Sequence, residues 1–320
     1  MKVNSQRDIS FKSIYTNKTV KKGFEFAASN GALFGASATV AFSAFRPISI
    51  LLTPKTEKEN RKIAAAKSIS SSIINFILML GISVPLAKSI KKIDDKPAKY
   101  LSSEAIKCLK DKNTELTASK GYEFGTQMFK LGIAALVAVP KAIMTAAGLP
   151  YIVDAMTAKN KQQNMNDISF KGNKLSNKPA NFIADIINRK GMLKFIDKYK
   201  DSNFPMHITA LTDVIATLAF MQQANKSKKI DEKRKNTLLY NAGISTALSI
   251  AGGYTLDKIL DKPCQKFISK YKLINKNDKN LSKQLQGIKI VKPFLILGTI
   301  YYILIPLIST FLAEKADKSN

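Results

Sequence analysis

Residues 293–313 read PFLILGTIYYILIPLISTFLA, twenty-one residues without a charged side chain. A helix of about 20 apolar residues can cross the roughly 30 Å of hydrocarbon in a bilayer, and a buried helix of a soluble protein rarely stays uncharged for that length. The run contains twelve Leu, Ile and Phe residues. At about −0.3 to −0.6 kcal/mol each, they favour membrane insertion by roughly 4 to 7 kcal/mol, before the polar and proline residues are discounted. The stretch therefore predicts a transmembrane helix that inserts unaided.

Five other runs resemble this one. Three of them carry no charge, and two carry a single charge each, Lys141 or Asp213. The mean hydropathy of the chain, −0.07, hides this clustering because the segments between the runs are rich in lysine. The pattern predicts an all-α, polytopic membrane protein with about six transmembrane helices. The predicted spans are residues 26–45, 68–87, 131–153, 206–225, 236–256 and 293–313.

Short motifs recur in the same order in the two parts of the chain. The segment DISFK occurs at 8–12 and again at 167–171, and ATVAF at 38–42 corresponds to ATLAF at 216–220. The tripeptide DKP follows the second run of each part. These matches predict two similar three-helix halves, residues 1–158 and 159–320.

An odd number of spans in each half would place the second half upside down relative to the first, as in many transporters. The alternative is the duplication of a scaffold without transport, because repetition carries no chemistry of its own. Both interpretations follow equally from the repeated motifs.

The composition excludes several kinds of site. The chain has 51 Lys and Arg against 23 Asp and Glu, a net charge of +28, with one His and two Cys. One His and two Cys are too few for structural zinc, and the nucleotide-binding, hydrolase and metalloprotease motifs are not found. We therefore expect no enzyme, no metal and no cofactor. The basic residues are spread over every connector instead of forming one patch, so we expect no nucleic-acid binding.

Two charged residues lie where a membrane makes them costly. Asp213 has Thr209 and Thr217 one helical turn away on either side, and Lys141 follows Pro140 in another run. Charged groups inside a bilayer usually face the bundle interior and have a partner. Asp213, Lys141, Thr209 and Thr217 are thus the predicted intramembrane site, for a small molecule or an ion of unknown identity. The alternative is a structural ion pair or a protonated, buried Asp213.

Small residues spaced four apart predict close helix packing. They occur at Gly31 and Gly35, and at Gly243 and Ala247. Such small-xxx-small faces let the backbones of neighbouring membrane helices approach one another. Arg46, which ends one run, is expected to extend its side chain to the membrane interface.

The partner predicted for this chain is a lipid bilayer, with anionic lipids at its basic connectors. In segment 98–112, Leu101, Ala105, Cys108 and Leu109 share one helical face, which suits either the headgroup layer or a solvated connector. The Lys and Arg counts of alternate loops are 24 and 25, so membrane orientation is not determined. We expect the cell membrane, and the Lys-, Asn- and Ile-rich composition points to a bacterial inner membrane. A homo-oligomer is compatible with the sequence.

Two functions remain open from the sequence. The first is a small transporter or channel that uses the intramembrane charges. The second is a non-catalytic, membrane-associated scaffold whose basic connectors bind anionic lipid. A soluble helical bundle is the least favoured alternative, because of the long uncharged runs.

Overall fold

Residues 14–29, 31–112, 114–157 and 178–319 are described in the computed structural model, and all of their regular elements are helical. The repeated DISFK segments at 8–12 and 167–171 lie outside the described residues. Contacts between residues divide the chain into two units. Unit 1 comprises Met1–Ser68 and Asn236–Asn320, and unit 2 comprises Ile69–Lys235. All-helical architecture is therefore confirmed for the described part of the chain.

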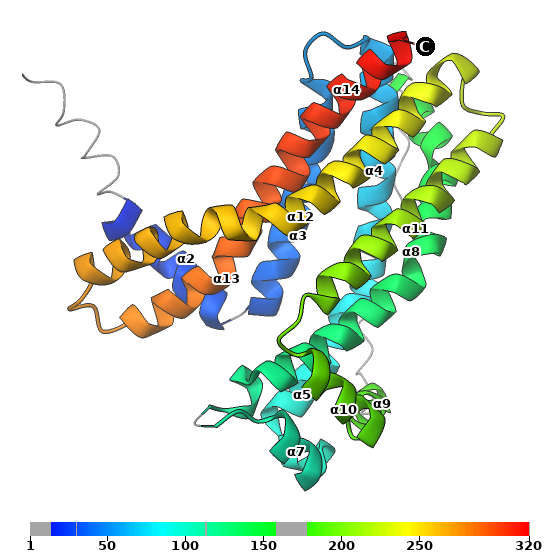
Figure 1. Ribbon diagram of the computed structural model, residues 1–320. Helices are drawn as coiled ribbons and strands as arrows, with labels where there is room; N and C mark the ends of the chain where they lie inside the picture. Colours follow the sequence, from blue (N-terminus) through cyan, green and yellow to red (C-terminus); the bar gives the residue numbers. More distant parts are fainter. Residues whose placement is uncertain (1–13, 30, 113, 158–177, 320) are drawn as a thin grey trace, which may run out of the picture. The chain divides into compact units, whose positions relative to one another are not determined.

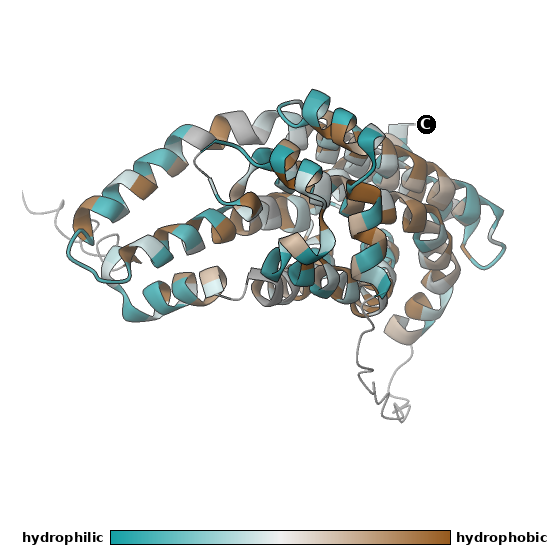
Figure 2. Ribbon diagram, turned by 90° about the horizontal axis from the view of Figure 1, so that it is seen from below, coloured by the Kyte–Doolittle hydropathy of each residue, from teal (hydrophilic) through white to brown (hydrophobic). Residues whose placement is uncertain are grey.

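Unit 1 is built from helices at the two ends of the chain. Its elements are α2 (Lys18–Ser29), α3 (Gly31–Leu51), the beginning of α4 (Lys58–Leu78), most of α12 (Glu232–Ile274), α13 (Leu281–Thr299), η3 (Ile300–Leu304) and α14 (Ile305–Ser319). α13 packs along α2, and α3 packs against α13, η3 and α14 (Figure 1). Tyr15, Tyr271 and Ile288 form a small buried cluster beside α2. Hydrophilic residues predominate where α12 and α13 meet (Figure 2).

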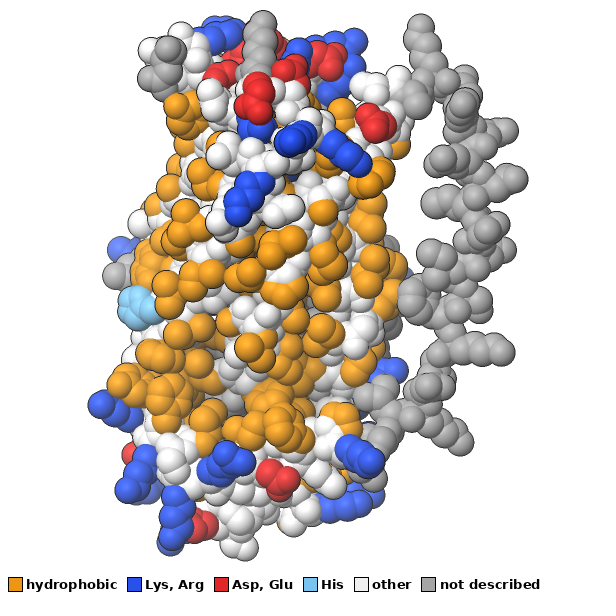
Figure 3. All heavy atoms as spheres, turned by 90° about the vertical axis from the view of Figure 1, so that its right-hand side faces the viewer, with side chains coloured by type: hydrophobic (Ala, Val, Ile, Leu, Met, Phe, Trp, Pro, Cys, Tyr) orange, Lys and Arg blue, Asp and Glu red, His pale blue; other side chains and the backbone are white. Residues whose placement is uncertain are grey.

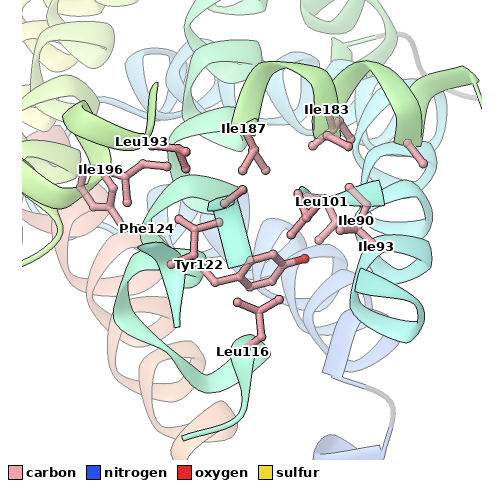
Figure 4. Close-up of a cluster of buried hydrophobic side chains, with 14 residues drawn as sticks. Ile90, Ile93, Leu101, Leu116, Tyr122, Phe124, Ile183, Ile187, Leu193 and Ile196 are labelled. Carbon is pink, nitrogen blue, oxygen red and sulfur yellow. The ribbon is translucent and has the colours of Figure 1, made fainter. Parts of the chain in front are cut away.

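Unit 2 combines two long helices with a group of short ones. Its elements are the end of α4, η1 (Met79–Ser83), α5 (Val84–Asp95), α6 (Pro97–Tyr100), α7 (Ser103–Leu109), η2 (Leu116–Ala118), α8 (Lys120–Thr157), α9 (Lys178–Ile187), α10 (Lys190–Tyr199) and α11 (Phe204–Lys226). α8 and α11 pack along each other. The short helices enclose an apolar core (Figure 4).

That core decides the role of segment 98–112. Leu101, Ala105 and Leu109 are buried in it, whereas Cys108 is exposed. Ser102 caps α7 by accepting a hydrogen bond from the backbone N–H of Ala105. The apolar face of segment 98–112, for which the headgroup layer was one of the two predicted surroundings, is thus covered by protein. The apolar side chains of α9 and α10 bury it.

Four helices of the described chain are long and apolar enough to cross a membrane. They are Lys58–Asp95, Lys120–Thr157, Phe204–Lys226 and Leu281–Ser319. The prediction of six spans is therefore not confirmed. The run 26–45 is divided between α2 and α3, and the run 236–256 lies in α12, whose asparagines and hydroxyls dilute its apolar residues.

Two of these four helices contain a π-helical turn. In Lys58–Asp95 the turn is η1 and is followed by Pro85, and in Leu281–Ser319 it is η3 and is followed by Pro306. The N–H of Val84 bonds to the carbonyl of Met79, five residues earlier. A proline ring collides with the carbonyl four residues before it, and a wider turn relieves that collision while the helix continues.

Candidate functional site

The interior of unit 1 is unusually polar for a protein with apolar outer faces. Uncharged polar side chains and one carboxylate are buried there. They come from α3, α4, α12 and α14, and from the residues just after α3. We call this set the polar core; it consists of Ser43, Ser49, Thr53, Asn60, Thr237, Asn241, Ser245, Ser309, Thr310 and Glu314. A buried polar group costs stability unless it is hydrogen-bonded, so the partners of these residues matter.

Hydrogen bonds within the polar core link different helices. Asn241 on α12 donates from Nδ2 to Thr310 Oγ1 at 3.1 Å and to Ser309 Oγ at 3.4 Å, both on α14. Asn60 on α4 donates to Glu314 Oε2 at 2.8 Å. The other carboxylate oxygen of Glu314 lies 2.8 Å from the Lys318 ammonium. The polar core therefore holds α4 and α12 to α14 by side-chain hydrogen bonds.

Two cations adjoin the polar core. Arg46 on α3 donates from Nη2 to Ser245 Oγ on α12 at 3.1 Å. Its guanidinium also interacts electrostatically with Tyr302 of η3, and with Lys67 on α4. Arg46 thus points into unit 1, and the expectation that it extends to the membrane interface is wrong. The inward orientation of Arg46 is stabilised because the Ser245 hydroxyl accepts a hydrogen bond from its guanidinium.

Lys67 lies on a segment of α4 that is buried on several sides. Ala65 and Ala66 have no exposed surface, and Ser68 is 4% exposed. Tyr302, the neighbour of Arg46, stacks on Phe42 with ring centroids 6.1 Å apart. Arg46 of α3 therefore contacts α12 through Ser245, and its charge acts on Lys67 of α4.

The residues of the predicted charged site lie in unit 2, on the packed helices α8 and α11. Lys141 on α8 acts electrostatically on the Asp213 carboxylate of α11. Asp213 is exposed and Lys141 is half-buried. Thr209 is exposed and donates its hydroxyl hydrogen bond to the Pro205 carbonyl of its own helix at 2.9 Å, and Thr217 is half-buried. The structure places these four residues on two neighbouring helices.

The predicted packing glycines differ in their surroundings. A Cβ on Gly35 would lie 3.0 Å from the ring of Phe294 on α13, which is a tight contact. A Cβ on Gly243 would meet nothing within 4 Å, and Ala247 is exposed. The surroundings of Gly31 lie outside the described residues. The closest glycine contacts in unit 1 are instead at Gly287 and Gly298, which the sequence spacing did not indicate.

A second polar network joins α2 to the connection between α12 and α13. Lys21 pairs with Asp278 at 2.8 Å, and this hydrogen bond, with that from the Asn280 backbone, lowers the pKa of Asp278 to about 2. Tyr271 donates to Gln284 Oε1 at 2.8 Å. Burial, followed by the charge of Asp278, raises the pKa of Tyr271 to about 12. The polar groups of this network bond to one another, and the Lys21–Asp278 pair holds α2 against the connection between α12 and α13.

Metal-binding groups are not found in the described residues. No three His, Cys, Asp or Glu side chains gather there as ligands would. Cys108 is exposed and Cys264 is half-buried, and both are free thiols.

Comparison of the chain with protein-family models, with curated proteins and with solved structures finds no match in any of the three. Functional inference therefore depends on the site itself.

Proposed function

We propose that this chain is a multi-pass integral membrane protein that conducts or carries a small polar solute, as a small transporter or channel. The observation that supports it best is the polar core of unit 1, in a chain whose long helices expose apolar side chains. Polar groups inside membrane proteins face the bundle interior and mark solute pathways.

The outer faces of the long helices favour a bilayer over water. In unit 2, Leu136 is 79% exposed, Leu218 59% and Leu211 56%. Figure 3 shows a broad band of hydrophobic side chains on the face that carries α8 and α11, with charged residues at its two ends. Contiguous apolar surfaces of this kind are rare on soluble monomers and mark a membrane or a protein partner. We propose the cell membrane, the bacterial inner membrane in particular, as its location.

The charged residues of unit 2 form a second part of this proposal. Asp213 and Lys141 would offset each other's cost of insertion, since each charge alone costs about 2.5 to 3.5 kcal/mol at the centre of a membrane helix. We also retain the two halves, residues 1–158 and 159–320, as a proposed inverted repeat.

Membrane integration is tested first by carbonate extraction of the membrane fraction. Retention in the pellet is expected of an integral protein, and release into the supernatant would contradict the proposal.

Flux is tested by light scattering from proteoliposomes under gradients of potassium phosphate, potassium glutamate, glucose or urea. We expect swelling with at least one solute, reduced by Asn241→Leu and Thr310→Val, which remove polar atoms from the core. Thr255→Val is the matched control, because Thr255 is exposed and bonds only within α12 in the described contacts. Asp213→Asn and Lys141→Met test the charged pair in the same assay. Swelling equal to that of protein-free liposomes with every solute would refute transport of these solutes.

A scaffold that binds anionic lipid is the second candidate, and the excess of 51 basic over 23 acidic residues favours it. Flotation with neutral and with anionic vesicles separates the two functions. Equal binding to both vesicles at low and high salt would exclude lipid-headgroup recognition.

A further inference from the structure

The connection between α12 and α13 exposes basic and apolar side chains together. We call residues 270–283, which include this connection, the basic tip. We propose that the basic tip binds the surface of an anionic bilayer other than the one that the protein spans. The inference rests on the proposed membrane integration, and it gives the second candidate function a defined lipid-binding surface.

The basic tip carries a large excess of positive charge. Asp278 is its one acidic residue, and the Lys21 ammonium of α2 pairs with it at 2.8 Å. The lysines of the tip are all exposed, and none of them is ion-paired within the described part of the chain. They are Lys270, Lys272, Lys276, Lys279 and Lys283. A lysine close to an anionic membrane surface strengthens binding roughly fivefold, so this charge complements such a surface.

Two large apolar side chains are exposed among these lysines. Leu273 is 72% exposed and Ile274 is 38% exposed. Proteins that bind a bilayer surface combine buried apolar area with attraction to anionic lipids. Nucleic acids are bound by basic and aromatic side chains, so the exposed aliphatic pair favours lipid. Residues 1–13 carry three basic residues and one acidic residue, and their charge therefore does not complement the tip.

Hydrogen bonds hold the basic tip in one arrangement. Tyr271 of α12 donates to Gln284 of α13 at 2.8 Å, which places the exposed pair level with the beginning of α13. Asn275 donates to the backbone carbonyl of Tyr15 at 3.1 Å. Gln284 donates to the Glu25 carboxylate of α2 at 2.7 Å. A surface that is ordered before binding loses little conformational entropy when it binds.

The length of α13 places the basic tip beyond the headgroups of the protein's own membrane. The uncharged run begins at Pro293, and α13 begins twelve residues earlier, at Leu281. Twelve helical residues extend about 18 Å. α13, η3 and α14 follow one another as one long helix (Figure 1). Even if that helix tilts by about 40°, its first residue stands about 14 Å above the hydrocarbon, whereas the headgroup layer is about 5 to 8 Å thick. The basic tip is therefore positioned to meet a second bilayer.

Capture of vesicles by the full-length protein tests this inference. The protein is placed in nanodiscs of phosphatidylcholine, which leave both faces of the bilayer accessible. The discs are mixed with vesicles of phosphatidylcholine alone or with phosphatidylglycerol, and the protein that floats with the vesicles is measured as the vesicle concentration rises. We expect saturable capture by the vesicles that contain phosphatidylglycerol, and weaker capture at high salt.

The charge of the tip is tested by a triple variant with a matched control. The tip variant combines Lys272→Gln, Lys276→Gln and Lys279→Gln, and it should weaken capture about tenfold or more. The control removes the same charge from exposed positions of unit 2, and it should weaken capture less than about threefold. It combines Lys107→Gln, Lys110→Gln and Lys112→Gln.

The apolar contact is tested separately, at constant charge. Leu273→Ser should weaken capture by about fivefold or more, because a leucine side chain would no longer enter the lipid. Leu52→Ser is the matched control, since Leu52 is 71% exposed in the same unit and lies outside the tip.

A fluorescent label distinguishes the two membranes. Ser282→Cys carries the label, because Ser282 is an exposed residue of the tip, and the native thiols are removed as Cys108→Ser and Cys264→Ser. Nitroxide lipid, which quenches the label, is placed either in the vesicles or in the disc. We expect quenching from the vesicles. Stronger quenching from the disc would show that the tip binds its own membrane and would overturn the inference.

Three results of the capture assay would also overturn it. The first is capture that is absent, or equal with neutral and anionic vesicles. The second is equal weakening by the two lysine triples, and the third is capture by Leu273→Ser as strong as that by Leu52→Ser. Carbonate extraction and solute-driven swelling need no second bilayer, so failure of the tip is distinguishable from failure of the proposed function.

Discussion

Replacement of Gly287 by alanine should loosen the contact between α13 and α2. A Cβ built on Gly287 would lie 1.9 Å from the carbonyl oxygen of Phe24 and 2.5 Å from its carbonyl carbon. Ordinary contact begins at 3.4 Å, so the two helices would have to separate by roughly 1.5 Å. The clashing atoms belong to the backbone of α2, and no side-chain rotation can remove them.

The cost follows from two opposing effects. Overpacking costs about 1 to 3 kcal/mol, and a backbone clash belongs at the upper end of that range. Alanine in a helix regains about 0.5 to 1 kcal/mol over glycine. We therefore expect Gly287→Ala to lower the free energy of unfolding by about 2 kcal/mol. It should also weaken the Lys21–Asp278 ion pair, which joins α2 to the residues just before α13.

Denaturant titration of the purified protein in one detergent measures this change. Gly132→Ala in α8 is the matched control, because a Cβ there meets nothing within 4 Å. The control should be unchanged or more stable by about 0.5 to 1 kcal/mol. If Gly287→Ala proves as stable as Gly132→Ala, α2 does not lie against α13 as described, and the reasoning fails.

Two further predictions concern polar contacts. The pKa of Asp278 is lowered to about 2 by Lys21 and its other donors, below about 3.9 in an unfolded chain. The stability that ionised Asp278 contributes is thus complete above about pH 4 and is lost as the pH falls through 2. The difference in Tm between wild type and Asp278→Asn should therefore shrink between pH 5 and pH 2. A difference in Tm that stays constant over this range would contradict the ion pair. The hydroxyl of Tyr122, a residue 3% exposed, donates a hydrogen bond to Asp94 Oδ1 at 2.5 Å. Tyr122→Phe should therefore lower the free energy of unfolding, measured by denaturant titration, by about 2 kcal/mol. Tyr151→Phe, at a residue 64% exposed, should change stability by less than about 0.5 kcal/mol, and equal effects of the two variants would refute the role of the Asp94 bond.

The helices were largely predictable from the sequence. An uncharged stretch of about 20 residues leaves few alternatives to a long helix, and four of the six predicted runs lie in helices able to span a membrane. The two π-helical turns were not predictable. Pro85 and Pro306 are visible in the sequence, but whether a proline kinks, ends or widens a helix depends on its neighbours in space.

The two cations of the candidate site were missed for an identifiable reason. The predicted runs were delimited by charges, and Arg46 directly follows the run 26–45, while Lys67 directly precedes the run 68–87. Both residues therefore counted as boundaries, so Arg46 was assigned to the membrane interface and Lys67 to a connector. The polar core was missed similarly, because Asn, Ser and Thr do not interrupt an uncharged run, and the face on which they lie follows only from packing.

Position at the end of an uncharged run does not decide whether a cation is solvated. A lysine or arginine there can extend toward water, or it can turn inward if a neighbouring helix offers acceptors. Ser245 is such an acceptor for Arg46, and it lies about 200 residues away in the sequence. The same local sequence is thus compatible with an interface anchor and with an interior cation. The difference depends on a hydroxyl group of another helix, which the sequence around Arg46 does not indicate.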